Sequence, residues 1–166
     1  ALSKGILVVC ACGNSGDNLA YTCEIDYPAY YNEVISVGAI DNTRVNANFS
    51  NSNKEIDLVA PGVNIISTGL NNGYTSLDGT SMATPHVTGA LALLKQKTTH
   101  EFGRTLTETE LYAQLIKNTI DLNLEKGVQG NGMCEHNCGI GRRGFLLCGA
   151  PYPSLEGGCV ELRHGY

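Results

Sequence analysis

Three short runs of almost purely apolar residues most constrain how this chain can fold. They cover residues 5–11, 34–40 and 56–60, and Pro61-Gly62 stops the last one. A continuous apolar run of this length is typical of a strand that is covered on both faces, as in a parallel sheet. The sequence therefore predicts at least three buried strands of a mainly parallel sheet.

The next residues predict a hairpin and two helices. Residues 64–68 and 74–77 alternate more and flank an Asn-Asn-Gly turn, which indicates a β-hairpin. Residues 81–97 are apolar on nearly every side, which predicts a buried helix. Residues 108–118 carry one apolar stripe after the Thr-x-x-Glu spacing of a capping box. We expect an α/β fold, a three-layer αβα sandwich around a mainly parallel sheet.

The segment Gly79–His86 reads Gly-Thr-Ser-Met-Ala-Thr-Pro-His and places a serine at the first turn of the long helix. Backbone N–H groups there have no intrahelical partner, and the helix dipole favours a negative charge beside them. A nucleophile that forms an oxyanion needs this setting, so Ser81 is the candidate nucleophile. The alternative is a Thr80 cap on an ordinary buried helix. That alternative does not explain why so many small residues precede the proline.

Asn14 is the candidate partner of Ser81. It lies just past the carboxyl end of the first predicted strand, where open α/β sheets place their sites. Its side-chain NH₂ can donate to a developing oxyanion together with the Ser81 backbone N–H. Gly-Asn-Ser-Gly alone is a common turn, and only the presence of Ser81 downstream suggests that Asn14 is an oxyanion donor.

Composition excludes several classes of protein. The chain of 166 residues is 42% hydrophobic and 16% charged, as in a globular domain, and its net charge of -5 offers no basic surface for nucleic acid. No apolar run is long enough to span a bilayer. Seven cysteines form no regular framework, and Cys10 and Cys12 are expected as buried free thiols. A reducing compartment, the cytoplasm, fits this pattern.

The segment Gly79–His86, with residues 7–14, 27–34 and 55–62, resembles the subtilisin-like serine proteases (peptidase family S8), most of all the intracellular subtilisins. The resemblance covers residues 1–132 and implies the C-terminal part of a subtilisin-like catalytic domain, incomplete at its N-terminal side. It implies a serine endopeptidase that cleaves peptide bonds through an acyl-enzyme on Ser81, with Asn14 in the oxyanion hole. Peptides and proteins are the implied substrates.

The family's triad follows the order Asp, His, Ser along the chain, and only the serine has a counterpart here. His86 does not suit the role of base, because five helical residues turn about 140° past a full circle and rise about 7.5 Å. We expect it to be a structural, hydrogen-bonded histidine. The N-terminal half of the domain is thus an expected partner, and the chain alone is expected to be inactive. The alternative is a non-catalytic remnant, or a half-domain that binds peptides.

The resemblance also places substrate-contacting residues. It implies that Ala11, Cys12 and Gly13 line the pocket for the residue before the cleaved bond, with Asp26 at the pocket floor. A carboxylate there attracts a basic side chain, which suggests acceptance of Lys or Arg. The alternative is a solvated loop aspartate.

The loop after Asp26 carries two further implications of the resemblance. Tyr27-Pro28 matches a cis-proline turn of the family. The backbone carbonyls of Ala29, Tyr31 and Val34 match a weak cation site, and oxygen ligands of this kind suit a structural Ca²⁺ or Na⁺. No cofactor is implied for catalysis.

Residues 133–166 depart from the family and are expected to form an irregular tail. Cys134, His136 and Cys138 fit no common zinc spacing. The full-length protein is implied to form a homodimer, an expectation that this departure weakens. The start of the chain carries no signal-peptide pattern and is expected to lie inside a domain.

Overall fold

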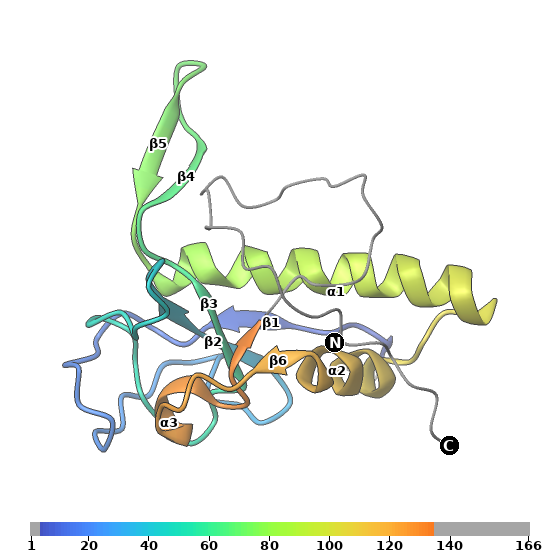
Figure 1. Cartoon of the computed structure of the whole chain (residues 1–166), viewed down its shortest axis with the longest axis horizontal. Helices are drawn as coiled ribbons and strands as arrows, with labels where there is room; N and C mark the ends of the chain where they lie inside the picture. The colour runs from blue at the N-terminus through green and yellow to red at the C-terminus, as the bar shows by residue number, and fades with distance from the viewer. Residues whose placement is uncertain (1–3, 135–166) are drawn as a thin grey trace.

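The computed structural model describes residues 4–134 (Figure 1). Its elements are, in chain order, β1 (Val9–Ala11), β2 (Ile35–Ile40), β3 (Leu58–Pro61), β4 (Ile65–Thr68), β5 (Tyr74–Leu77), α1 (Thr80–Phe102), α2 (Glu108–Lys117), β6 (Thr119–Ile120), α3 (Lys126–Gln129) and β7 (Met133–Cys134). The first two strands lie within their predicted runs, whereas β3 includes Pro61, which was expected to end it. The first strand is shorter than its run, because only Val9–Ala11 pairs with a neighbour in register.

Five strands form one sheet in the order β1-β2-β3-β7-β6. Neighbours are parallel from β1 through β7, and β6 is antiparallel to β7. Val37 of β2 lies opposite Ala11 on one side and Leu58 on the other. The prediction of a mainly parallel sheet is confirmed.

Alternation along the central strands divides the core between the two faces of the sheet. One face meets α1 and α2, and α1 contacts β1, β2 and β3. The buried residues of this larger cluster include Ile35, Val37, Ala39, Leu58, Ala60, Ala83, Val87, Leu91, Leu94, Leu111 and Leu115. The opposite face holds a smaller cluster of Ile40, Val59 and Met133, against which Ile120 and Leu122 pack. The predicted α/β architecture is confirmed, with helices packed against the sheet.

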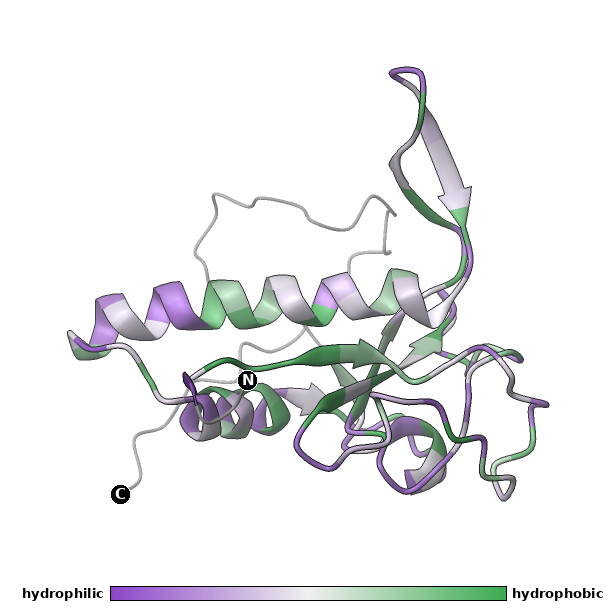
Figure 2. Cartoon of the chain, turned by 180° about the vertical axis from the view of Figure 1, so that it is seen from behind, coloured by the Kyte–Doolittle hydropathy of each residue, from purple (hydrophilic) through white to green (hydrophobic). Residues whose placement is uncertain are grey.

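Helix α1 lies along the sheet, and no other helix or strand of residues 4–134 covers its far side (Figure 1). It continues beyond the predicted end at residue 97 to Phe102, where Gly103 ends it with a left-handed φ of 65°. Its exposed residues include Pro85, Thr88 and Ala92. The prediction of a helix buried on all sides is therefore wrong for residues 4–134, because no described element packs on that side. Figure 2 shows hydrophobic strands beneath α1 and a more hydrophilic C-terminal end of the helix.

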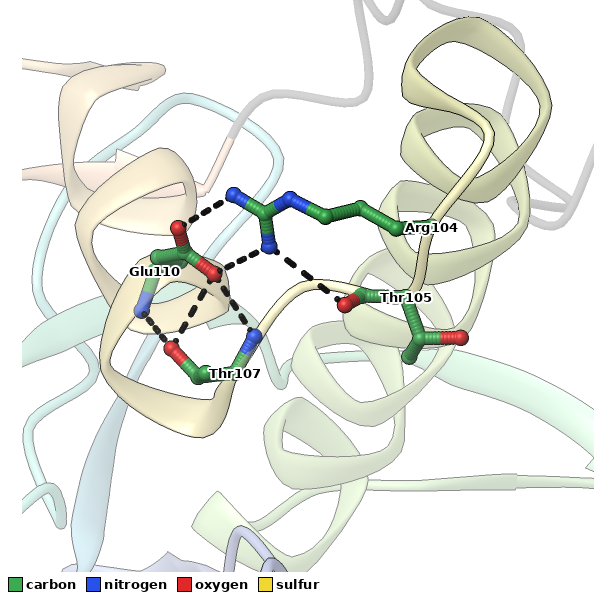
Figure 3. A network of polar contacts seen from close by, with 4 residues as sticks. All are labelled: Arg104, Thr105, Thr107 and Glu110. Atoms are coloured by element: carbon green, nitrogen blue, oxygen red, sulfur yellow. Dashed lines mark hydrogen bonds and ion pairs between the residues drawn. The ribbon is translucent and has the colours of Figure 1, made fainter.

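The connection between α1 and α2 is held by one carboxylate (Figure 3). The Arg104 guanidinium donates to both oxygens of Glu110, at 2.8 and 2.6 Å. The same carboxylate accepts the Thr107 N–H at 2.8 Å, and the Thr107 hydroxyl accepts the Glu110 N–H at 3.3 Å. The predicted capping box is confirmed, and Arg104 adds a bidentate ion pair to it.

The hairpin of β4 and β5 is confirmed and projects from the body of the molecule (Figure 1). Its apolar side chains are open to solvent, with Leu70 at the tip 92% exposed and Tyr74 80% exposed. No helix in residues 4–134 combines the length and apolar content needed to cross a membrane.

The sequence did not indicate β6, α3 or β7. Met133 and Cys134 begin the segment expected to be irregular, yet they are buried and form β7, with Met133 opposite Val59. A strand of two residues has no periodicity to detect, and its partner lies far away in the chain. Residues 135–166, with His136 and Cys138, lie outside the described residues.

The free edge of β1 predicts self-association of the isolated chain. Within residues 4–134, β1 pairs only with β2, so the backbone groups of its other edge have no strand partner. Ile6 beside this edge is 55% exposed. We expect the purified chain to associate as its concentration rises from the micromolar to the millimolar range, as measured by sedimentation velocity. A stable monomer with a sharp, reversible unfolding transition would contradict this expectation.

Glu110 predicts a pH dependence of stability. Hydrogen bonding to Arg104, and then to Thr107, lowers the pKa of Glu110 from 4.5 to about 2. The folded-state pKa lies below the unfolded value, so this contribution is complete above about pH 4.5 and is lost as the pH falls through about 2. We expect Arg104→Gln to return the pKa of Glu110 toward 4.5, measured by NMR titration of its carboxyl carbon. Lys117→Gln on the same helix should leave that pKa unchanged, and a pKa still near 2 without Arg104 would refute the assignment.

Candidate active site

Ser81 is the second residue of α1, and its side chain is exposed. Gly79 precedes the helix with φ 152° and ψ 156°, a backbone region that is almost restricted to glycine. The buried Gly79 N–H donates to the carbonyl of Gly62 at 2.8 Å, which fixes the turn into the helix. A residue with a side chain would therefore strain the turn that presents Ser81.

Asn14 reaches the same helix start from the loop after β1. Its Oδ1 accepts both the backbone N–H and the hydroxyl of Thr80, each at 2.9 Å. Only an oxygen can accept the Thr80 N–H, so these contacts fix which way the Asn14 amide faces. The Nδ2 group is left to point elsewhere, and it has no acceptor among residues 4–134.

Two N–H donors thus remain unsatisfied beside Ser81. In the first turn of α1, Thr80 N–H is bound by Asn14, and the N–H groups of Met82 and Ala83 reach the Gly79 carbonyl at 3.0 and 3.4 Å. The Ser81 N–H has no partner within the described part of the chain. It lies 3.7 Å from the position that a Cβ on Gly79 would take, and Asn14 Nδ2 lies 3.8 Å from the same point.

Apart from Gly79 and its chain neighbours, the nearest atom to that point is Met82 Sδ at 3.4 Å, so an atom fits there, within 4 Å of both donors, because Gly79 has no side chain to fill the space. A negatively charged oxygen placed there would face two N–H groups and the positive end of the helix dipole. The first turn of α1 contains no acidic side chain that would oppose such a charge. The site is chemically suited to hold an oxyanion next to a serine hydroxyl.

His86 is engaged elsewhere in α1. Its Nδ1 lies 2.8 Å from the carbonyl oxygen of Met82 and donates to it, because a carbonyl can only accept. The prediction of a hydrogen-bonded histidine is confirmed. His100, the second histidine of residues 4–134, is exposed near the far end of the helix.

The loop that carries Asn14 is held by a residue that the sequence did not indicate. Asn51 is 1% exposed, and its Oδ1 accepts the Ser15 N–H at 2.7 Å. Its Nδ2 donates to the Cys12 carbonyl at 2.8 Å and to Asp26 Oδ2 at 3.0 Å. Asn51 therefore binds the backbone on both sides of Gly13 and Asn14. No local pattern marks it, since an Asn-Ser-Asn run after a predicted strand reads as an exposed turn.

The predicted substrate-contacting residues gather beside this loop. Ala11 ends β1, and the thiol of Cys12 is buried against Ser50 and Asn51. Burial raises the pKa of Cys12 to about 11. Gly13 has φ 115°, and a Cβ there would overlap the Asp26 carboxylate and the Asn51 amide.

The turn after Asp26 contains the expected cis bond between Tyr27 and Pro28. The N–H of Val34 donates to the Tyr31 carbonyl at 3.0 Å, so that carbonyl already has one partner. Ala29 is buried, and no carboxylate belongs to the predicted set of three carbonyls. Three neutral oxygens suit a weakly held hard cation better than a cation that needs charged ligands. Residues 4–134 contain no cluster of His, Cys, Asp and Glu suited to a metal ion.

Two cavities on the described surface lie away from Ser81. One of about 340 Å³ is lined by residues that include Leu19, Asn46 and Val128, and one of about 420 Å³ by residues that include Cys23, Tyr30 and Lys126. Neither contains Ser81, Asn14 or Asp26.

Comparisons with known proteins identify relatives among serine proteases. The chain is 55% identical over 132 residues to the major intracellular serine protease of Bacillus subtilis (strain 168). It is 57% identical over 133 residues to the intracellular serine protease of Paenibacillus polymyxa. Each match covers 80% of this chain and 41% of the relative. Subtilisin DY of Bacillus licheniformis is 50% identical over 97 residues, which is 58% of this chain and 35% of that protein.

The chain therefore spans about two fifths of the length of these two intracellular serine proteases. A sequence profile of the subtilase family matches residues 1–141, which is most of the chain. The protein belongs to the subtilase family of serine proteases.

Proposed function

We propose that this chain supplies the nucleophile and the oxyanion-binding part of a serine endopeptidase. Ser81 Oγ attacks the carbonyl carbon of a peptide bond, and the carbonyl oxygen becomes the oxyanion. Asn14 Nδ2 and the Ser81 N–H donate to that oxyanion. The amine then leaves with the proton that came from Ser81 Oγ, an acyl-enzyme on Ser81 remains, and water hydrolyses it to an acid and returns a proton to Ser81. The observation that carries this proposal is the pair of unsatisfied donors around Gly79.

A general base must take the proton of Ser81 Oγ, and neither described histidine lies in a position to do so. We propose that the triad histidine and aspartate come from the N-terminal part of the catalytic domain. The 41% coverage of the relatives supports this assignment. Without a base the hydroxyl is a weak nucleophile, and loss of the triad histidine lowers turnover by about 10⁶-fold in this family. The chain alone is therefore expected to be inactive.

A second candidate is a half-domain that binds peptides without cleaving them. The oxyanion donors are complete within this chain although the base is not, so an acyl group or peptide carboxylate has a place to bind. The two candidates differ in whether the nucleophile is used once a base is supplied.

Four further expectations belong to the proposed enzyme. A Na⁺ or Ca²⁺ ion would bind the carbonyls of Ala29, Tyr31 and Val34 and stiffen the turn after Asp26. Peptides and proteins are its substrates, and the complete protein is expected to form a homodimer. We assign it to the cytoplasm, because two of its relatives are named intracellular serine proteases and Cys10, Cys12 and Cys23 are free thiols.

A grafted enzyme tests the proposed function. Residues 1–134 of this chain replace the matched segment of the Paenibacillus polymyxa intracellular serine protease, which supplies the remaining part of the domain. We expect the graft to cleave peptide p-nitroanilides, Ser81→Ala to lower turnover by about 10⁶-fold and Asn14→Ala by about 10²–10³-fold. The 166-residue chain alone should show no turnover above background.

Matched controls make this test specific. Ser67→Ala removes an exposed serine of β4 and should leave turnover unchanged. A sulfonyl fluoride should modify Ser81 in the active graft, as located by mass spectrometry. Full activity in Ser81→Ala would overturn the catalytic proposal, whereas an inactive graft that still binds peptides would favour the non-catalytic candidate.

A further inference from the structure

Asp26 carries a negative charge beside the loop that presents Asn14. Its Oδ2 accepts from Asn51 Nδ2 at 3.0 Å and lies where a side chain on Gly13 would otherwise project. The same Asn51 side chain holds the carbonyl of Cys12 and the N–H of Ser15. One buried amide thus fixes the position of the Asp26 carboxylate relative to the loop of the oxyanion donor.

No cation of the described residues neutralises this charge. The ion pairs within residues 4–134 are Lys54–Glu55, Lys97–Glu101 and Arg104–Glu110, and none of them involves Asp26. Asp26 is also exposed, so its second oxygen is open to solvent or to a ligand. A carboxylate in this setting is free to pair with a cation brought by a bound peptide.

The other residues predicted to line this pocket, Ala11, Cys12 and Gly13, carry no charge. The Cys12 thiol keeps its proton at neutral pH, because burial raises its pKa to about 11. Gly13 contributes only backbone, and Ala11 offers a methyl group. The charge of Asp26 is therefore the main electrostatic feature that a substrate side chain would meet here.

We propose that Asp26 makes the enzyme select a basic residue, Arg or Lys, immediately before the cleaved bond. This inference rests on the proposed function, because it takes the cleaved carbonyl to lie between Asn14 and Ser81. A long basic side chain on the acyl side of that carbonyl reaches along Gly13 to the carboxylate. Arg matches a carboxylate with two parallel N–H donors, and Lys matches it with a compact charge.

The rival interpretation assigns Asp26 a structural role only. Its carboxylate helps to orient Asn51, and its backbone carbonyl accepts the Tyr30 N–H at 3.0 Å. A structural role alters all substrates alike, whereas a pairing role alters only those with a positive charge. Paired substrates of equal shape and different charge separate the two interpretations.

The experiment uses the grafted enzyme and peptides that differ only in the residue before the cleaved bond. Arginine is compared with citrulline, its neutral isostere, and lysine with norleucine. We expect kcat/KM to favour the charged member of each pair by about 10- to 100-fold, the range for a hydrogen-bonded charge pair. Asp26→Asn should abolish the difference, mainly by slowing cleavage of the arginine peptide. The preference should also weaken as salt is added.

Three variants complete the test. Asp26→Glu keeps the charge and should keep part of the preference. Asp26→Ser is a second neutral variant, whose side chain differs from that of Asn in its contact with Asn51. Glu33→Gln removes an exposed charge from the same loop and should leave the preference intact. Equal cleavage of arginine and citrulline peptides, or a preference that survives both neutral variants, would overturn this inference while Ser81 catalysis stands. A graft that cleaves no peptide would instead overturn the proposed function and this inference with it.

Discussion

The contact between Asn14 Oδ1 and Thr80 organises the rest of the site. It joins the loop after β1 to the start of α1, two segments separated by 66 residues. An ordinary hydrogen bond contributes about 1 kcal/mol to stability. This contact has a second effect, because it decides which N–H donors remain free. Thr80 uses its N–H and its hydroxyl on one oxygen. The amide nitrogen of Asn14 and the N–H of Ser81 are left facing the space beside Gly79. In the proposed function, the oxyanion-binding site is thus made from these two donors, one of which, the Ser81 N–H, is a group that helix geometry leaves unsatisfied.

Buried polar side chains keep that contact in register with the sheet. Asn51 uses its amide on the loop and on Asp26, and Ser50, which is 2% exposed, accepts the N–H of Ala39 in β2 at 3.0 Å. Such groups are costly to bury unless each finds a partner, and these find theirs in the backbone of neighbouring segments. An apolar residue at position 51 would leave the Cys12 carbonyl and the Ser15 N–H without that partner. These hydrogen bonds therefore restrict the position of the Asn14 loop more tightly than apolar packing alone would.

Local chemistry explains which features were predictable from the sequence. The strands at 34–40 and 56–60, the hairpin, and the capping box of Thr107 and Glu110 each carry a signal within a few residues. Ser81 and Asn14 do lie at a helix start and after a strand end, as the sequence indicated, and their catalytic roles stay a prediction. The pairing of β7 with β3, the role of Asn51 and the ion pair of Arg104 depend on segments that meet only in the folded chain. The open side of α1 was misjudged for another reason: an apolar helix predicts a covering layer, and the described residues do not include one.

The charge of Asp26 links substrate choice to the chemical step. A carboxylate near the oxyanion raises the energy of a transition state that gains negative charge. Two unit charges 4 Å apart interact by about 4 kcal/mol at an effective dielectric of 20, and the energy falls with distance. A neutral substrate leaves that repulsion in place. A basic substrate side chain offsets it while pairing with Asp26, and the offset grows as the oxyanion forms. Interactions that strengthen in the transition state raise kcat, whereas uniform binding changes only KM. In the proposed enzyme, the preference for a basic residue should therefore reside partly in kcat, a signature that a purely structural Asp26 would not produce.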